Sequence, residues 1–171
     1  VTLVVTHDAE EAMELGDRIA YLWQGQLAQL GTPAALWRTP ASLPVALAFG
    51  DAQQLPAASA EGGLQTPFGP IAAGNFTDCR QRQGAQCQLV VRPDSVQLLP
   101  EPEQPVARIE DVRFVGGGLV LLLRSLSDPD AALLRVRKPV DVDGANSDQF
   151  ALTQSVGLAF SKAGLFAYDG D

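Results

Sequence analysis

From about Asp51 to its end, this 171-residue chain consists of short stretches rich in apolar and β-branched residues, separated by glycine, proline and aspartate turns. None of these stretches has the 3.6-residue apolar spacing of an amphipathic helix. Many short strands joined by regularly placed turns are typical of a small barrel or sandwich. We therefore predict a mainly β domain over residues 51–171, with strands at 53–58, 63–66, 86–92, 96–99, 107–115, 119–126, 132–138, 156–161 and 165–168.

Two features of this region predict how its strands are arranged. Residues 119–123 form an unbroken apolar run, which indicates an interior strand. Residues 100–105 form a polar, proline-rich linker, which would divide the region into two β halves. No clean internal repeat relates the two halves, so their similarity stays a hypothesis.

Residues 1–50 have a different pattern, which predicts a short α/β segment. Residues 1–5 are apolar and β-branched, as in a strand buried on both faces of a parallel sheet. The chain holds no partners for such a sheet, so we expect this strand to be disordered, to pair with another chain or to fold onto the second domain. A helix over residues 9–15 follows, with Asp8 as N-cap, Glu11 completing a capping box and Gly16 as a left-handed stop.

Three further elements are predicted before residue 51, each bounded by turn or capping residues. They are a hairpin of residues 18–23 and 26–30 around Gln24-Gly25, a short helix from Thr32-Pro33 to about Arg38, and a short helix over residues 44–49. The change from this mixed pattern to strands alone predicts a domain boundary near residue 50.

The only histidine of the chain, His7, lies between the predicted first strand and the first helix. A side chain in that position can point toward a phosphate, which the partial positive charge and free N–H groups of a helix N-terminus also favour. An imidazole can donate a hydrogen bond to such a phosphate. Taken alone, a histidine beside a capped helix is most often structural, so its meaning depends on the surrounding sequence.

That surrounding sequence resembles one family in five successive elements. They are Thr6-His7-Asp8, the Glu11-Ala12-Met13 that follows it, Gly16-Asp17-Arg18-Ile19-Ala20, Gly25-Gln26-Leu27 and Gly31-Thr32-Pro33. This order resembles the switch histidine and the end of the nucleotide-binding domain of ABC transporter ATPases. The resemblance implies that His7 is a catalytic-site residue, which contacts the γ-phosphate of ATP and helps to set up the attacking water.

The other motifs of such an ATPase do not occur in this sequence. It contains no GxxxxGK[ST] phosphate loop and no Walker B strand ending in paired acids. The resemblance therefore implies a C-terminal fragment of an ATPase subunit, with ATP and Mg bound only by the full-length parent. For the fragment alone we expect no cofactor and no ATP hydrolysis.

The β region resembles the accessory domains called TOBE, which have an OB-like fold. The resemblance rests on Arg92-Pro93-Asp94 within residues 90–96, on the strand and glycine turn of residues 107–116, and on the closing strands of residues 156–161 and 165–168. It implies a small OB-like β-barrel that regulates or dimerises the ATPase. From the residues themselves, Arg92 can pair with Asp94 or with a carboxylate across a dimer. A turn with a simple surface ion pair is as good an interpretation of this segment as a regulatory role.

Residues 49–57 and the hairpin of residues 64–71 resemble most the iron(III)-importer branch of this family. ATPases for polyamines, sulfate and sugars share the same layout. The resemblance implies that a periplasmic binding protein and membrane permease subunits, and not this chain, select the solute. The full complex would place the subunit on the inner face of the bacterial cell membrane.

The net charge of −8 argues against several other functions. It repels phosphate backbones and gives no attraction to an anionic membrane surface. We expect a cytosolic protein with no leader peptide, and no apolar run reaches the ~20 residues that span a bilayer. The spacing of Cys79 and Cys87 fits no zinc motif, so no metal site is predicted, and a disulfide between them is the minority interpretation.

A second interpretation is a stand-alone module that binds an anion or small solute, or that only dimerises. Arg135 and Arg137 alternate onto one face of a predicted strand beside Lys138, which gives either a modest basic patch or a solvated edge that prevents aggregation. Binding of single-stranded nucleic acid needs aromatic residues in a basic groove, and the negative charge argues against it. We also expect a homodimer, because the apolar strand of residues 1–5 and the hairpin need cover.

Overall fold

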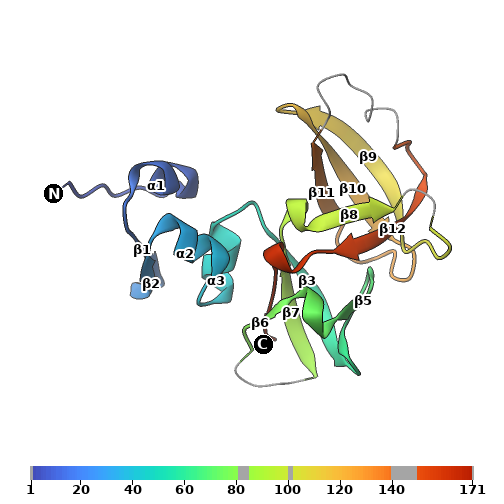
Figure 1. Ribbon diagram of the computed structural model, residues 1–171, viewed down its shortest axis with the longest axis horizontal. Coiled ribbons are helices and arrows are strands. Elements are labelled where there is room, and N and C mark those ends of the chain that lie inside the picture. The colour runs from blue at the N-terminus through green and yellow to red at the C-terminus, as the bar shows by residue number, and fades with distance from the viewer. Residues whose placement is uncertain (1, 81–84, 100–101, 140–149, 171) are drawn as a thin grey trace. The chain divides into compact units, whose positions relative to one another are not determined.

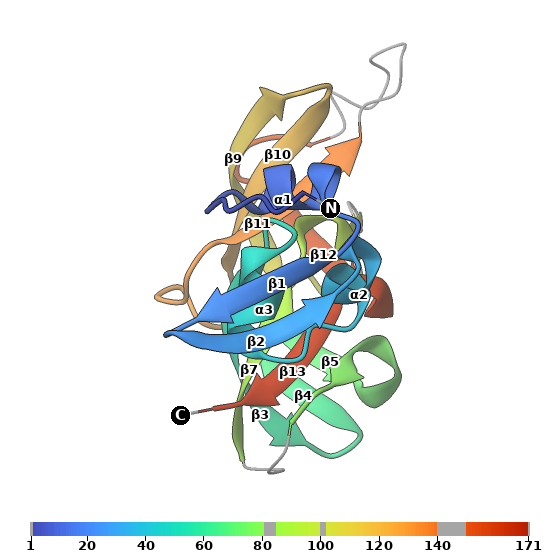
Figure 2. The same ribbon diagram turned by 90° about the vertical axis from the view of Figure 1, so that its left-hand side faces the viewer.

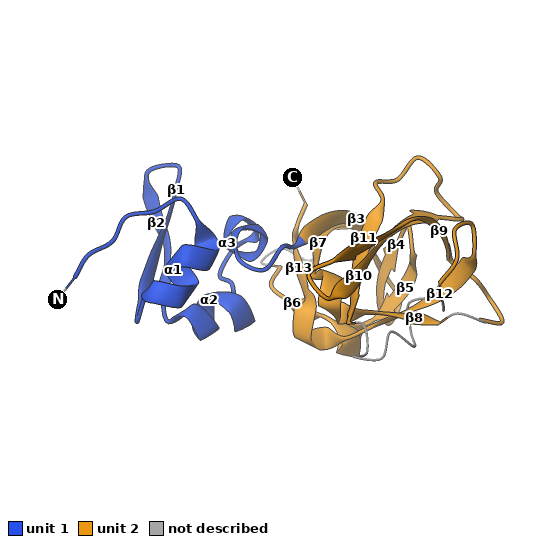
Figure 3. Cartoon of the chain, turned by 90° about the horizontal axis from the view of Figure 1, so that it is seen from above, with its two compact units in different colours: residues 1–52 blue, residues 53–171 orange. Residues whose placement is uncertain are grey.

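The computed structural model describes residues 2–80, 85–99, 102–139 and 150–170 (Figure 1). The chain forms two compact units, Val1–Ala52 and Gln53–Asp171, which Figure 3 distinguishes by colour. The division between them lies two residues from the boundary predicted near residue 50. Each unit has its own apolar core.

The first unit contains three short helices and one β-hairpin, at the positions that the sequence predicts. Its elements are α1 (Ala9–Leu15), β1 (Ile19–Trp23), β2 (Gln26–Gly31), α2 (Pro33–Arg38) and α3 (Leu43–Ala48). The β1–β2 turn has positive φ at both central residues, 50° at Gln24 and 76° at Gly25, as in the turns that suit the right-handed twist of a hairpin. Thr32 caps α2 by accepting the N–H of Ala35 at 3.2 Å.

A small core holds the first unit together. Its buried members are Ile19, Leu36, Val45 and Phe49, and the ring of Phe49 meets that of Tyr21 edge-on, with centroids 5.5 Å apart. Three residues of α1 pack against this cluster but stay partly exposed: Ala9, Ala12 and Met13. The core is therefore small, and much apolar surface of the unit remains outside it.

The predicted strand at the N-terminus is not formed. Residues 2–6 have no regular secondary structure, and Leu3 and Val5 are 89% and 91% exposed; Val1 lies outside the described residues. A strand needs a neighbour to satisfy its backbone N–H and C=O groups, and the described residues provide none for this segment. The apolar pattern therefore marks a segment suited to a sheet, but it pairs with no strand in the part of the chain that the structure describes.

Gly16 also differs from its prediction. Its φ of −92° is extended and not left-handed, so it is not the expected C-terminal stop of that type. A side chain at this position would place Cβ only 2.8 Å from the carbonyl oxygen of Ala12. Glycine is required here because the backbone passes close to the last turn of α1.

The second unit is a mainly β, barrel-like domain made of two curled sheets. One sheet has the strand order β5-β4-β3-β7-β13-β6 and the other β11-β10-β9-β12-β8. The strands of the first are β3 (Gln53–Ala60), β4 (Gly63–Thr66), β5 (Gly69–Ala72), β6 (Thr77–Asp78), β7 (Gln86–Val91) and β13 (Leu165–Asp169). Those of the second are β8 (Val96–Leu99), β9 (Ala107–Val115), β10 (Gly118–Ser125), β11 (Leu134–Pro139) and β12 (Ser155–Phe160).

One continuous core fills the space between the two sheets. Strands of both contribute side chains that are fully buried, among them Leu55, Leu89, Leu121, Leu134 and Leu165. A side chain also ties the two sheets together, because the Gln53 side-chain amide of β3 exchanges two hydrogen bonds of 2.7 Å with the Arg135 backbone of β11. The predicted mainly β fold is thus confirmed, and β10 is interior, between β9 and β11.

The β domain does not consist of two halves in sequence. β8 comes before residues 100–105 and pairs with β12, whereas β13 comes after them and pairs with β7. Both sheets therefore take strands from either side of the predicted linker, of which residues 100 and 101 lie outside the described part of the chain. The linker connects two strands of one sheet and separates no subdomains.

Candidate functional site

His7 lies in a bend directly before α1, and its side chain is exposed. The backbone on its C-terminal side is held by short-range hydrogen bonds: the N–H of Asp8 donates to Thr6 Oγ1 at 3.0 Å. The Asp8 carboxylate accepts the N–H groups of Glu10 and Glu11 at 2.8 and 3.1 Å. The imidazole is thus presented to solvent from a backbone that its neighbours fix.

This arrangement changes which groups are available to a phosphate. Asp8 already occupies two backbone donors of α1, so the free N–H groups expected at this helix end are taken up in part. The capping box is also only half formed, because the Asp8 N–H bonds to Thr6 and not to Glu11. The exposed imidazole of His7 lies at this end of α1 and can donate a hydrogen bond to an anion.

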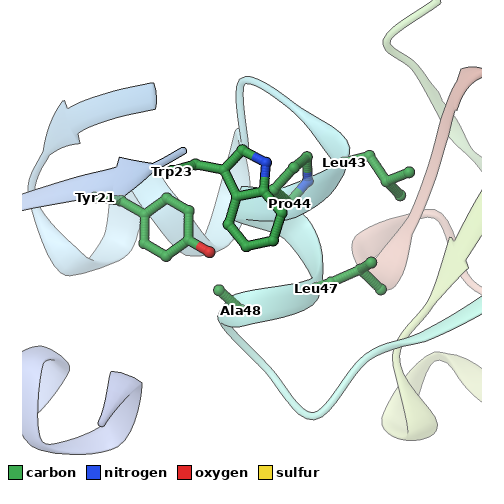
Figure 4. A pocket seen from close by; sticks show the side chains of 6 residues that line it. All are labelled: Tyr21, Trp23, Leu43, Pro44, Leu47 and Ala48. Atoms are coloured by element: carbon green, nitrogen blue, oxygen red, sulfur yellow. The ribbon is translucent and has the colours of Figure 1, made fainter. Parts of the chain in front are cut away.

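An apolar pocket of about 390 Å³, which the sequence did not predict, lies between the β1–β2 hairpin and α3. Figure 4 shows the rings of Tyr21 and Trp23 on one side and residues of α3 on the other. The α3 side is lined by Leu43, Pro44, Leu47 and Ala48. Its lining is mostly apolar, so the pocket can accept apolar groups, and the Tyr21 hydroxyl and Trp23 indole N–H are its polar side-chain groups.

Arg92 has a different environment from the predicted one. It is 2% exposed, its guanidinium lies over the Phe166 ring at 5.0 Å, and Asp94 is exposed to solvent. Burial lowers the pKa of Arg92 to about 10. The prediction of a surface ion pair with Asp94 is therefore wrong, and Arg92 is part of the packing of the β domain.

Cys79 and Cys87 lie on opposite sides of β13. Cys87 pairs in register with Asp169 of β13, while the N–H of Cys79, just after β6, donates to Ala167 on the other edge of that strand at 2.8 Å. Both are free thiols. Neighbouring strands are about 4.8 Å apart, so an intervening strand exceeds the Cα separation that a disulfide allows. The minority interpretation of a disulfide is wrong for this structure.

The two thiols make the stability of the β domain dependent on pH. Burial raises the pKa of both Cys79 and Cys87, so in the range of about pH 8.5–10 the unfolded chain loses thiol protons more readily than the folded one. We expect the free energy of unfolding to fall as pH rises through this range. Urea denaturation at several pH values should show this slope and a shallower one in the Cys79→Ala/Cys87→Ala variant. Equal slopes in both proteins would contradict the prediction.

The outer face of the β9–β10–β11 sheet carries most of the arginines of the β domain. Opposite Val120 of β10 stand Arg113 of β9 and Arg137 of β11, and opposite Leu122 stand Asp111 and Arg135. Arg135 and Arg137 therefore share one face, as predicted, while Lys138 lies in register with the core residue Leu119 and places its ammonium 5.9 Å from the Phe150 ring.

Carboxylates neutralise part of this face. Arg113 Nε lies 2.6 Å from the Asp111 carboxylate, and Arg124 Nε lies 2.6 Å from that of Glu110. The Arg124 guanidinium lowers the pKa of Glu110. These pairs are accessible to solvent, so each contributes little stability, and they mainly fix the direction of the guanidinium groups.

The described residues contain neither a cluster of metal-ligand side chains nor a helix suited to span a membrane. In residues 2–80, 85–99, 102–139 and 150–170 no group of three or more His, Cys, Asp or Glu side chains is arranged to hold a metal ion. No helix within these ranges has the length and apolar character needed to cross a membrane.

No protein-family model matches the chain, but individual proteins do. A sulfate/thiosulfate import ATP-binding protein of Chromobacterium violaceum is 33% identical over 174 residues, which is 99% of this chain and 46% of that protein. A spermidine/putrescine import ATP-binding protein of Pseudomonas fluorescens is 32% identical, over 94% of this chain and 43% of its own length. An Fe(3+) ions import ATP-binding protein of Serratia marcescens is 36% identical, over 67% of this chain and 32% of its own length. The chain spans less than half the length of these relatives.

Proposed function

We propose that this chain is the C-terminal part of an ATP-binding subunit of an ABC importer, since its homologues are ABC importer ATP-binding subunits with several different cargoes. The observation that carries the proposal is the match of nearly the whole chain to less than half of such a subunit. The motif order around His7 supports the C-terminal position, because the switch histidine of these ATPases follows their phosphate loop and Walker B strand.

In this proposal His7 acts on ATP that the rest of the subunit binds. Its exposed imidazole, fixed next to the capped α1 helix, is free to donate to a γ-phosphate and to orient the attacking water. In the proposal, the preceding part of the parent supplies the phosphate loop and the groups that hold Mg²⁺. The exposed residues 2–6 would then join the parallel sheet of that part.

The β domain would regulate hydrolysis or stabilise a homodimer of the parent, as an accessory domain with its own core. Membrane permease subunits and a periplasmic binding protein would complete the importer, with the subunit at the inner face of the bacterial membrane. Iron(III) is the cargo that residues 49–57 favour. Relatives for sulfate, polyamine and glycerol phosphate have similar identities, so transport assays of the assembled importer with each cargo are the test of that choice.

The purified chain is expected to hydrolyse no ATP by itself. It lacks a phosphate loop, and a single imidazole donor gives no binding site for the nucleotide. A coupled phosphate-release assay measures this, with a non-hydrolysable ATP analogue as competitor. Turnover that is specific for nucleotide and lost in a His7→Ala variant would contradict the proposal.

The coding sequence upstream of Val1 tests the proposal directly. An in-frame phosphate loop and Walker B strand would support the truncated subunit, and an adjacent binding-protein gene would identify the class of cargo. An in-frame stop codon there would instead favour a stand-alone binding or dimerisation module.

The observation that favours this second candidate is the arginine-rich outer face of β9–β10–β11 on a domain with its own core. Light scattering over a range of concentrations would test the homodimer in both cases.

A further inference from the structure

One face of the β1–β2 hairpin is apolar and exposed. Residues that stand directly opposite each other in antiparallel strands have side chains on the same face. Two such pairs form this face, Ala20 with Leu30 and Leu22 with Leu27, and we call it the outer hairpin face. Leu22, Leu27 and Leu30 are 66%, 56% and 49% exposed, and Ala20 is exposed as well. The hairpin therefore presents a surface of apolar side chains to solvent.

The opposite face of the same hairpin is covered within the first unit. Ile19 is buried in the small core, the ring of Tyr21 packs against Phe49, and Trp23 lines the pocket beside α3. Figure 2 shows β1 and β2 side by side with α3 behind them, and Figure 3 shows α2 and α3 on one side of the hairpin. A sheet with helices on one face and apolar side chains on the other is complete only when a further layer covers the second face.

The outer hairpin face has no charged residues around it in the hairpin. Residues 19–31 contain no Asp, Glu, Lys or Arg, although the chain has a net charge of −8. In the described residues, eight large apolar side chains of the first unit are exposed, against five in the larger second unit. Proteins usually place charged residues on small sheets that stay in solvent. An uncharged apolar face is instead typical of a surface that is buried in the functional protein.

We propose that the preceding part of the parent subunit packs against the outer hairpin face, which is therefore buried in the complete subunit. The inference rests on the proposed function, since only a C-terminal fragment has a preceding part. Residues 2–6 connect the first unit to that part, and the exposed side chains of Leu3 and Val5 would be buried together with the hairpin. The covering layer would itself be apolar and uncharged, because the hairpin offers no charged partner.

The size of the face favours a partner in the same chain. A stable interface between two separate proteins buries about 800 Å² on each of them, with ~20–30 residues a side. The outer hairpin face has four side chains. Two separate molecules also lose translational and rotational freedom when they associate, whereas a layer that is covalently connected to the hairpin has already lost most of it. A second copy of the chain is therefore a poorer occupant, and a homodimer of the parent would use other surfaces.

The test compares this chain with a chimera in which the preceding part of the Chromobacterium violaceum subunit is joined to Val1. Leu22→Cys and Leu30→Cys are made separately in both proteins, and mass spectrometry of the peptides measures how fast a maleimide labels each new thiol. In the isolated chain both thiols should react rapidly, because both positions are exposed. In the chimera their labelling should be slower by about tenfold or more, because a buried thiol reacts only when its surroundings open.

A control variant and a second readout accompany the labelling. Leu126→Cys is the matched control, since Leu126 is a 42% exposed leucine of the β domain, and it should be labelled at the same rate in both proteins. Leu22→Glu should lower the urea midpoint of the chimera, because it buries a charge without a partner. In the isolated chain the same variant should leave the midpoint unchanged, because the side chain stays in solvent.

Nucleotide binding by the unmodified chimera separates this inference from the proposed function. If the chimera binds a fluorescent nucleotide but Leu22→Cys and Leu30→Cys are labelled as fast as in the isolated chain, the inference is wrong and the proposed function stands. If the chimera binds no nucleotide and the labelling is also unchanged, both are wrong. Slow labelling in the isolated chain that becomes faster on dilution would overturn the inference in favour of a second copy.

Discussion

Replacing His7 by alanine is expected to lower the ATPase rate by about 10²–10³-fold in a chimera that joins the first half of a relative to this chain. The Chromobacterium violaceum subunit is a suitable donor, because it matches 99% of the chain. The reason for the large effect is that a donor positioned at the γ-phosphate acts where charge develops in the transition state. Steady-state phosphate release at saturating ATP measures the loss.

The controls separate a loss of chemistry from a loss of folding. Glu14→Gln changes an exposed side chain of the same helix and should retain the full rate. Binding of a fluorescent nucleotide by the His7→Ala chimera should persist, because the phosphate loop of the donor half provides most of the affinity. A His7→Ala chimera that hydrolyses ATP at the unmodified rate would remove His7 from the catalytic machinery, whatever the family of the chain.

The parts of the structure that the sequence predicts best depend on neighbouring residues in the chain. Asp8 and Thr32 cap helices because their side chains reach the next N–H groups, and Gln24-Gly25 turns the hairpin because both residues accept positive φ. The strands of the β domain follow from apolar residues between turn residues. Such local preferences need no knowledge of the rest of the fold.

The parts that the sequence does not predict depend on distant partners. Residues 2–6 have the composition of a buried strand, but a strand forms only where a neighbour accepts its hydrogen bonds. β6 is two residues long, and it exists because β13 lies beside it. Arg92 looks like a surface residue in a turn, and only the packing of Phe166 shows that it is buried.

The largest expected effect on stability comes from the core of the β domain. Leu121 lies on the interior strand β10 and has no exposed surface. Leu121→Ala removes buried methyl groups and leaves a cavity, so the free energy of unfolding of the second unit should fall by about 2–5 kcal/mol. Val120→Ala, at the next position but on the half-exposed outer face, is the matched control and should cost less than about 1 kcal/mol.

The positions of the tryptophans allow the two units to be observed separately. Trp23 and Trp37 are the only tryptophans of the chain and both lie in the first unit, so their fluorescence reports its unfolding, while far-UV circular dichroism is dominated by the larger β domain. Because each unit has its own core, Leu121→Ala should move the circular dichroism transition in urea and leave the fluorescence transition in place. Leu36→Ala should do the reverse. If both signals shift together in Leu121→Ala, the first unit depends on the folded β domain, and the two units are then one cooperative structure.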